Sequence, residues 1–135
     1  SDLIFAAQRG VKVRIAVPAK PDHLLTFCVG KTFQKNLMDY GIEVYEYQKG
    51  FIHAKTFISD GKMATVGSVN LDYRSLYLHF ENGVWFYKNK VIQDILSDFQ
   101  ETLNYCDPIS IDFCRNRNIV IRAFQSILRL FAPLL

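Results

Sequence analysis

The sequence predicts a mixed α/β domain, on two observations. Short stretches of alternating apolar and polar residues, typical of strands, are interleaved with longer stretches whose apolar residues recur every three or four positions, typical of helices. Half of the 135 residues are hydrophobic, which is enough for one domain with a core. The formal net charge of +3 favours no class of partner by itself, and no signal peptide is visible.

The first third of the chain contains two helix and two strand signals. Val11, Val13, Ile15 and Val17 alternate with polar or small residues, and the alternation ends at Pro18. Gly10 and Gly41 follow apolar-periodic stretches, where glycine commonly ends a helix. We therefore expect a helix at residues 2–9, a strand at 11–17, a helix at 24–39 and a strand at 42–47.

Residues 51–75 have the pattern of two short strands around a turn. His53 and Lys55 are two positions apart, and the period of a strand places them on one face. Asp60-Gly61 is a hairpin turn signal, and residues 63–66 are the expected return strand. The loop at residues 67–70 then carries a serine and an asparagine to the end of the strand pair where the histidine and the lysine are expected.

The second half of the chain begins with a strand and continues with a helix. Residues 82–87 are nearly continuously apolar, so we expect a strand that is buried on both faces. Residues 90–105 carry an apolar stripe at helical spacing, which core packing explains without any further function. We expect Cys106-Asp107-Pro108 to interrupt the chain and a short helix to start near Ser110.

The last stretch, residues 118–135, differs in character from the rest. Arg122 and Arg129 belong to a narrow polar face, and apolar residues cover the remainder. Such an amphipathic helix suits a membrane surface, whereas two arginines in so short a stretch argue against a spanning helix. A helix docked on the core is the alternative. We expect a domain at residues 1–117 and this amphipathic helix at 118–135.

The residue types gathered around the turn fit phosphate chemistry. Lysine is a compact cation for a phosphate oxygen, and asparagine and serine are neutral donors. Histidine is the side chain best suited to attack phosphorus or to move a proton near neutral pH. The sequence has no carboxylate pair, Cys/His cluster or Walker-type glycine loop, so we expect neither a metal nor an organic cofactor.

The spacing His53-x-Lys55-x4-Asp60-x6-Gly67-Ser68-x-Asn70 resembles the HKD motif of the phospholipase D superfamily at every fixed position. Within that superfamily the whole chain is most similar to the C-terminal half of bacterial cardiolipin synthases. The resemblance implies a phospholipase D-like mixed β-sheet flanked by helices, as one HKD half-domain. The stretches that carry this second likeness are Pro18–His23, Tyr45–Tyr47, Gly50–Lys55, Asn70–Ser75, Phe80-Glu81 and Leu130–Leu135.

The resemblance also implies an activity and its partners. Cardiolipin synthases of this kind transfer a phosphatidyl group from one phosphatidylglycerol to the hydroxyl of another and release glycerol. They work through a phosphohistidine intermediate between two HKD motifs, of which this chain has one. We therefore expect a second motif from a longer chain, which would also hold membrane-spanning helices, or from a homodimer mate. A phospholipid substrate at the bacterial cell membrane, with the catalytic part on the cytoplasmic side, completes this expectation.

Individual residues receive roles from the resemblance, beside simpler interpretations. His53 is expected to be the general acid/base, although the sequence does not separate it from the nucleophile. Glu81 occupies the position of the acid that holds the imidazole, or is a strand-edge charge. Asp60 completes the motif but is what any hairpin turn favours, and Ser68 and Asn70 could be turn residues. The expected catalytic set is His53, Lys55, Asp60 and Glu81, and the expected phosphate-binding set is Lys55, Ser68 and Asn70.

Several weaker assignments complete the sequence-based expectations. Asp72 and Arg74 are expected to form a local ion pair in a loop, and His79 has no partner pattern. A phosphodiesterase or nuclease that pairs with itself is one alternative function, and an inactive isolated half-domain is another. The apolar Phe51, Ile52 and Ala54 beside the motif do not form the basic cluster of a nucleic-acid site, so no nucleic-acid partner is expected.

Overall fold

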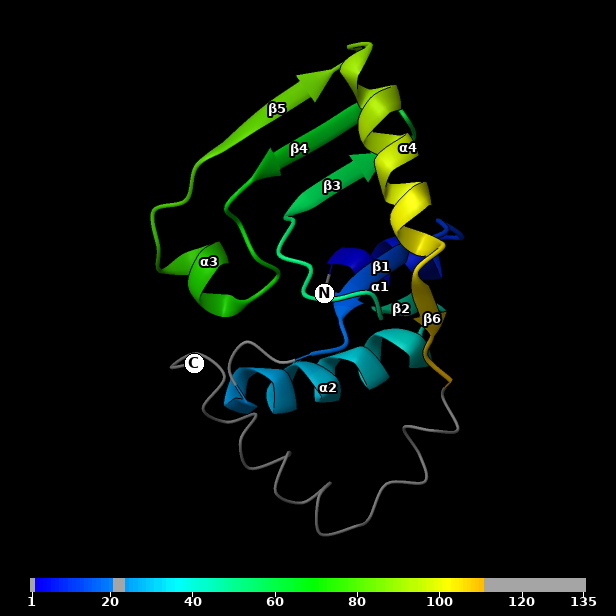
Figure 1. The fold of residues 1–135 in the computed structure, drawn as a ribbon, viewed down its shortest axis with the longest axis vertical. Coiled ribbons are helices and arrows are strands. Elements are labelled where there is room, and N and C mark those ends of the chain that lie inside the picture. Colours follow the sequence, from blue (N-terminus) through cyan, green and yellow to red (C-terminus); the bar gives the residue numbers. More distant parts are fainter. Residues whose placement is uncertain (1, 21–23, 111–135) are drawn as a thin grey trace, which may run out of the picture. The chain divides into compact units, whose positions relative to one another are not determined.

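The computed structural model describes residues 2–20 and 24–110, and the chain divides into two compact units (Figure 1). One unit contains the described residues before Ile52 together with those from Cys106 onward, and the other is Ile52–Tyr105. Both combine a three-stranded sheet with helices. The predicted mixed α/β class, with sheets flanked by helices, is confirmed.

The sheet of the first unit has the strand order β1-β2-β6 and is of mixed direction. Strands β1 (Arg14–Pro18) and β2 (Glu43–Tyr47) are parallel, with Ile15 opposite Val44. Strand β6 (Cys106–Pro108) pairs antiparallel with β2, so the expectation that these residues merely interrupt the chain is wrong. Pro108 is tolerated because it ends an edge strand, where no further ladder donor is needed.

The two helices described in the first unit end as their glycines predict. Helix α1 (Asp2–Gln8) is followed by Gly10 at φ +88°, and helix α2 (Leu24–Asp39) by Gly41 at φ +83°. The amide of Gly41 donates to the carbonyl of Met38 at 3.0 Å, and the amide of Ile42 donates to that of Leu37 at 3.2 Å. This Schellman pattern needs a left-handed residue, which glycine adopts without a steric penalty.

The core of the first unit lies where α2 meets β2. Met38, Ile42 and Val44 are buried there. The alternation predicted for the first strand is confirmed for Val13, Ile15 and Val17, which pack against this cluster. It is wrong for Val11, which precedes the strand and is 49% exposed. The other half-buried contributors are Leu3, Ile4, Ala7, Leu37 and Ile109.

The second unit is an antiparallel sheet with two helices. The strand order is β3-β4-β5, and each strand pairs with the next along the chain. Helix α4 contacts all three strands, and Figure 1 shows it running alongside them. The elements are β3 (Thr56–Ser59), β4 (Met63–Gly67), α3 (Tyr73–Tyr77), β5 (Gly83–Tyr87) and α4 (Val91–Leu103).

The turn between β3 and β4 is the predicted Asp-Gly turn. Asp60 has φ 51° and Gly61 has φ 61°, the pair of positive values that hairpin turns of type I′ need. The amide of Lys62 donates to the carbonyl of Ser59 at 3.0 Å and closes the turn. The register of the strand pair is thereby fixed, with Thr56 opposite Val66.

The sheet of the second unit is covered on one face by α4. Ala64 and Ile92 are buried between them, as the apolar stripe of the helix predicts. The expectation that the strand at 82–87 is buried on both faces is wrong, because Val84 is exposed and Trp85 is 63% exposed. β5 pairs only with β4 among the described strands, so its apolar run marks an exposed edge strand and not a central one.

Some predicted features lie outside the described residues. They are the short helix after Ser110, the amphipathic helix at 118–135 and part of the loop at 19–23. The predicted boundary between residues 117 and 118 lies there too, and remains a prediction. Among the helices of residues 2–20 and 24–110, none is long and apolar enough to cross a bilayer.

Candidate active site

His53 and Lys55 lie directly before β3, not within it. The strand begins at Thr56, so the predicted strand position of His53 is wrong, although the ladder reaches Lys55, whose carbonyl accepts from the amide of Gly67 at 3.2 Å. The next amide of β4, that of Ser68, faces the other neighbour and donates to the carbonyl of Asn82 at 2.8 Å. His53 is therefore exposed on a segment that the sheet anchors at one end.

The ammonium group of Lys55 is held beside His53 by the backbone. Its Nζ donates to the carbonyl oxygen of His53 at 2.8 Å. Lys55 is half-buried, whereas the imidazole of His53 is exposed. One donor hydrogen of the ammonium is engaged in this bond, and two others are available for a phosphate oxygen.

Ser68 and Glu81 meet at the end of the β4–β5 pair. The hydroxyl of Ser68 donates to Oε2 of Glu81 in a short hydrogen bond. The same hydroxyl accepts from the amide of Asn82 at 3.0 Å. The predicted partner of Glu81 was the imidazole of His53, and that contact remains a prediction.

Glu81 is stabilised in its ionised form. Hydrogen bonds from the hydroxyls of Ser68 and Ser75 lower the pKa of its carboxyl group below 4.5, its ordinary value, and the positive charges of His79 and Lys55 act in the same direction. The positive charge of Lys55 therefore helps to keep the carboxyl group of Glu81 ionised. Lys55 lies directly before β3, and Glu81 lies shortly before β5. A cation, a carboxylate and hydroxyl groups gather in one small region.

Ser75 is the site residue that the sequence reasoning missed. It is buried in α3, and its amide donates to Oδ1 of Asp72 at 2.7 Å, which caps the helix. The pattern Asp-x-x-Ser is an N-cap signal and could have predicted this short helix. The expected ion pair of Asp72 with Arg74 is wrong, because Asp72 caps the helix while Nη2 of Arg74 lies 3.1 Å from Nε2 of His79.

Asp60 and Asn70 differ in how the structure places them. Asp60 lies in the turn at the far end of β3, about 16 Å of extended chain from Lys55 at roughly 3.3 Å per residue. It is therefore not brought together with the rest of the motif, and its sequence-based alternative as a turn residue fits its position. Asn70 is exposed two residues after Ser68, in the loop that leads to α3, and its phosphate contact remains a prediction.

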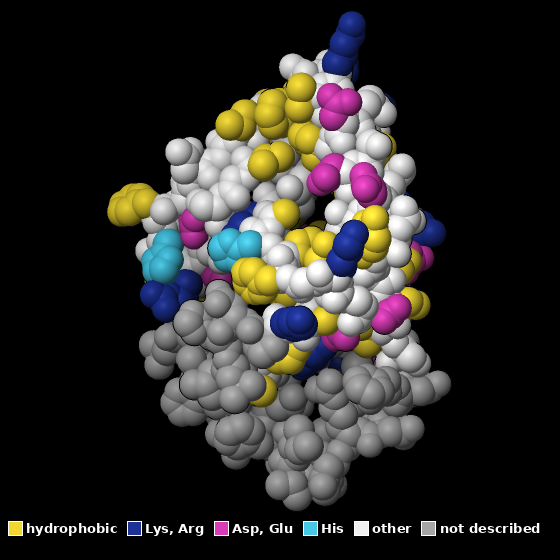
Figure 2. Space-filling view, in the orientation of Figure 1, with side chains coloured by type: hydrophobic (Ala, Val, Ile, Leu, Met, Phe, Trp, Pro, Cys, Tyr) yellow, Lys and Arg dark blue, Asp and Glu magenta, His cyan; other side chains and the backbone are white. Residues whose placement is uncertain are grey.

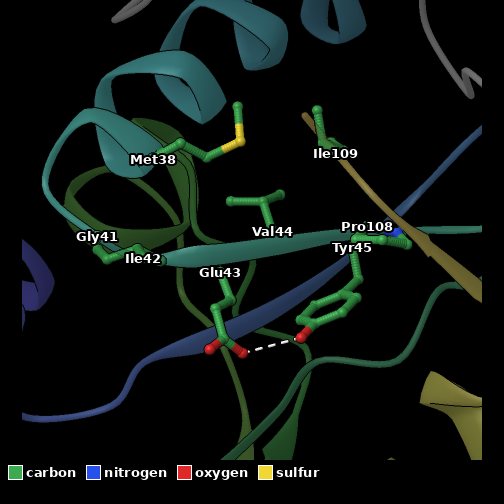
Figure 3. A pocket seen from close by; sticks show the side chains of 8 residues that line it. All are labelled: Met38, Gly41, Ile42, Glu43, Val44, Tyr45, Pro108 and Ile109. Atoms are coloured by element: carbon green, nitrogen blue, oxygen red, sulfur yellow. Dashed lines mark hydrogen bonds between the residues drawn. The ribbon is translucent and has the colours of Figure 1, made fainter. Parts of the chain in front are cut away.

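A pocket of about 250 Å³ lies in the first unit and contains none of these residues. Figure 3 shows Val44 on one side of β2 with Met38 and Ile109, and Glu43 and Tyr45 on the other side. The Tyr45 hydroxyl donates to Glu43 at 2.8 Å and holds the pKa of that carboxyl group below its usual value. The lining is mainly apolar, so it does not offer the groups of a catalytic site.

The described residues hold no group of three or more His, Cys, Asp or Glu side chains arranged as metal ligands. The site is instead an open surface of charged and hydroxyl groups. Figure 2 shows histidine side chains exposed on the visible face of the molecule. Such a surface offers an imidazole and an ammonium to a phosphate that approaches from solvent or from a partner surface.

Comparison with known proteins decides the family. Residues 1–103 match the sequence model of the family described as "Cardiolipin synthase, PLD-like domain". The chain belongs to this family. This match to the PLD-like domain of cardiolipin synthases confirms the family that the HKD spacing predicted. The members of this family are enzymes.

Relatives of the PLD-like domain are similar along nearly the whole chain. A cardiolipin synthase of Halalkalibacterium halodurans is 38% identical over 135 residues, which is 100% of this chain and 27% of that protein. A cardiolipin synthase of a Geobacillus species is 37% identical over 133 residues, 98% of this chain and 26% of that protein. An uncharacterized protein of Streptococcus mutans is 41% identical over 133 residues, which is 98% of this chain and 29% of that protein. The chain thus spans less than a third of each relative.

A solved structure shares the fold of the PLD-like domain. It is a phospholipase D family member, Nuc from Salmonella typhimurium, with a TM-score of 0.66 and 22% sequence identity. The match covers 78% of this chain and 69% of that chain. At this level of identity the likeness shows the fold alone, and it agrees with the phospholipase D-like fold predicted from the sequence.

Proposed function

We propose that this PLD-like domain supplies one of the two HKD motifs of a phosphatidyltransferase that makes cardiolipin. The observation that carries the proposal is the gathering of His53, Lys55, Ser68 and Glu81 on the exposed surface of one unit, in a chain of the cardiolipin synthase family. The substrate would be phosphatidylglycerol, whose phosphodiester carries one negative charge. An ammonium group and neutral donors suit that charge without a metal ion.

The proposed first step transfers the phosphatidyl group to the protein. The histidine of the second HKD motif attacks phosphorus, a nitrogen–phosphorus bond forms, and the bond from phosphorus to the glycerol oxygen breaks. His53 donates a proton to that oxygen, so glycerol leaves as a neutral alcohol. Lys55 and Asn70 bind the non-bridging phosphate oxygens, and Lys55 is already positioned by the carbonyl of His53.

The proposed second step reverses the proton transfer. His53, now neutral, takes the proton from the terminal hydroxyl of a second phosphatidylglycerol, and the oxygen attacks phosphorus. The nitrogen–phosphorus bond breaks and cardiolipin is released. Glu81, whose ionised form is favoured by the hydroxyls of Ser68 and Ser75, supports the charged imidazole that this cycle requires.

The second motif would come from the remainder of a longer chain or from a second copy of this one. The relatives are more than three times as long as this chain, which supports the first source. We place the reaction at the bacterial membrane because the named relatives are bacterial cardiolipin synthases. We further propose that the catalytic part lies on the cytoplasmic side. Apolar residues beside His53 support a lipid, and not a nucleic acid, as the partner.

The decisive experiment is lipid extraction after incubation of the full-length protein with phosphatidylglycerol. His53→Ala is expected to lower the rate of cardiolipin formation by about 10³-fold, within the range that positioned acid–base groups contribute. Lys62→Ala removes an exposed lysine beyond the hairpin turn and should leave the rate unchanged. Cardiolipin made at the normal rate by the His53→Ala protein would contradict the proposal.

A further inference from the structure

The segment at residues 71–80 exposes an unusual amount of apolar surface. It joins the loop of Ser68 and Asn70 to Glu81, so both of its ends belong to the candidate site. Leu76 is 51% exposed and Phe80 is fully exposed. The exposed large apolar side chains of this segment are Leu71, Tyr73, Leu76, Tyr77, Leu78 and Phe80.

The backbone of the 71–80 segment is held in place, so its apolar side chains are not exposed by disorder of the chain. Asp72 caps α3 through the amide of Ser75 at 2.7 Å, and Ser75 is the buried residue of that helix. The amides of Leu78 and His79 donate to the carbonyl of Arg74 at 2.9 and 2.8 Å. Glu81 is tied to Ser68 at the other end. A short element is thus fixed at both ends while its apolar side chains face outward.

Arg74 supplies the cationic group of this segment, and its guanidinium is exposed. Arg74 and His79 are exposed, and Nη2 of Arg74 lies 3.1 Å from Nε2 of His79. The one acidic residue of the segment, Asp72, has a carboxylate oxygen engaged in the helix cap. Tyr73 and Tyr77 have ring centroids 4.9 Å apart, and tyrosine favours the boundary between lipid headgroups and acyl chains.

We propose that the 71–80 segment is a membrane-docking surface that inserts its apolar side chains into an anionic phospholipid bilayer beside the active site. This inference rests on the proposed function, because a lipid phosphodiester must reach His53 while its acyl chains remain in the bilayer. Exposed apolar and tyrosine side chains beside the exposed guanidinium of Arg74 match the two layers of a bilayer surface, its acyl chains and its anionic headgroups.

Vesicle flotation of the 135-residue chain tests this surface. Leu76→Gln together with Phe80→Gln is expected to lower binding to vesicles of equal parts phosphatidylglycerol and phosphatidylcholine by about tenfold. Phe5→Gln together with Val11→Gln is the matched control, since these residues are 61% and 49% exposed in the first unit, and should leave binding unchanged. Equal binding by the two double variants would overturn the proposal, as would wild-type binding that does not exceed background.

Two further measurements distinguish a bilayer from a protein as the occupant of this surface. Arg74→Gln should reduce the preference for phosphatidylglycerol over pure phosphatidylcholine vesicles, and an unchanged preference counts against the surface. If the wild-type chain sediments as a dimer that Leu76→Gln dissociates, the segment is a protein interface and the proposal is wrong. His53→Ala should bind vesicles like the wild type, so that failure of the chemistry and failure of the surface give different results.

Insertion can be measured directly, because Trp85 is the single tryptophan of the chain. In a Trp85→Phe background, Phe80→Trp should give fluorescence that phosphatidylglycerol with brominated acyl chains quenches. Phe5→Trp in the same background should not be quenched. Quenching that is equal at the two positions, or absent at both, would show that the 71–80 segment does not enter the bilayer.

Discussion

Glu81 is held by two hydroxyl groups, from Ser68 and Ser75, and so keeps its charge at lower pH than an ordinary glutamate. The two serines come from different elements, the loop after β4 and helix α3. Hydrogen bonds to a carboxylate favour the charged form, and the nearby charges of His79 and Lys55 add to the effect. A carboxylate that stays ionised is the condition for supporting a charged imidazole.

Ser68→Ala should raise the pKa of Glu81 toward 4.5, because the hydrogen bond that lowers it most is lost. The lowered pKa means that ionised Glu81 contributes stability above about pH 4.5, which is lost as the pH falls through the lowered value. The variant should therefore show a weaker loss of stability on acidification in that range. Carbon-13 NMR titration of the Glu81 carboxyl measures the shift. Ser97→Ala, an exposed serine of α4, should leave the titration unchanged.

At this scale the sequence motif located the region but not all the contacts within it. The spacing from His53 to Asn70 predicted which residues share one unit, because a hairpin of fixed register follows from Asp60-Gly61. Ser75 was missed because its Asp-x-x-Ser signal indicates the start of a helix but not a hydroxyl that bonds Glu81. Arg74 was assigned to Asp72 because the two are close in sequence. The sequence does not show that the Asp72 carboxylate caps α3 and that Arg74 contacts His79 instead.

The β4–β5 pair is unusually close at its site end. Gly67 and Gly83 lie opposite each other in register, and a Cβ atom on Gly67 would lie 2.4 Å from the carbonyl oxygen of Asn82 and 2.6 Å from the Cα of Gly83. Side-chain atoms do not occupy such distances, so one of the two backbones would have to move. This approach brings Ser68 to Asn82 and Glu81, and glycine at position 67 is therefore a requirement of the site.

Gly67→Ala is expected to destabilise the fold by about 2–3 kcal/mol, since it forces two backbones apart. Gly30→Ala is the matched control, because its Cβ meets nothing within 4 Å and glycine within a helix is unfavourable by about 0.5–1 kcal/mol relative to alanine. Denaturant unfolding of both variants measures the difference. Equal free energies of unfolding for the Gly67→Ala and Gly30→Ala variants would show that the two backbones can separate without loss of stability.

The elements were predicted well where a turn or a cap has its own residue signal. Gly41 ended its helix as expected, and the hairpin at Asp60-Gly61 formed as expected. The exposure of β5 could not be predicted, because a continuous apolar run looks the same in a buried central strand and in an exposed edge strand. The strand at Cys106–Pro108 was missed because three residues next to a proline carry no periodicity.

At the scale of the whole chain, each of the two compact units has buried residues of its own. Met38, Ile42 and Val44 form the cluster of the first, and Ala64 and Ile92 are buried in the second. The candidate site residues all belong to the second unit. The sequence did not predict this division, because interleaved helices and strands are equally consistent with one sheet and with two.

Ile92→Ala should destabilise the second unit by about 2–4 kcal/mol, since the side chain is fully buried between α4 and the sheet. Hydrogen exchange should then accelerate in β3, β4 and β5 more than in β1 and β2. Ile42→Ala is the matched variant in the first unit, where the side chain is 2% exposed, and should give the opposite pattern. Equal acceleration in both units by either variant would show that they unfold as one.

The bond from the ammonium group of Lys55 to the carbonyl of His53 uses the main chain of residue 53 and not its ring. Exchanging the ring for a smaller group therefore leaves Lys55, the proposed phosphate anchor, where it was. A protein altered in this way should still capture its lipid while failing to turn it over. Such a variant is a substrate trap, suited to isolating the native lipid from cells.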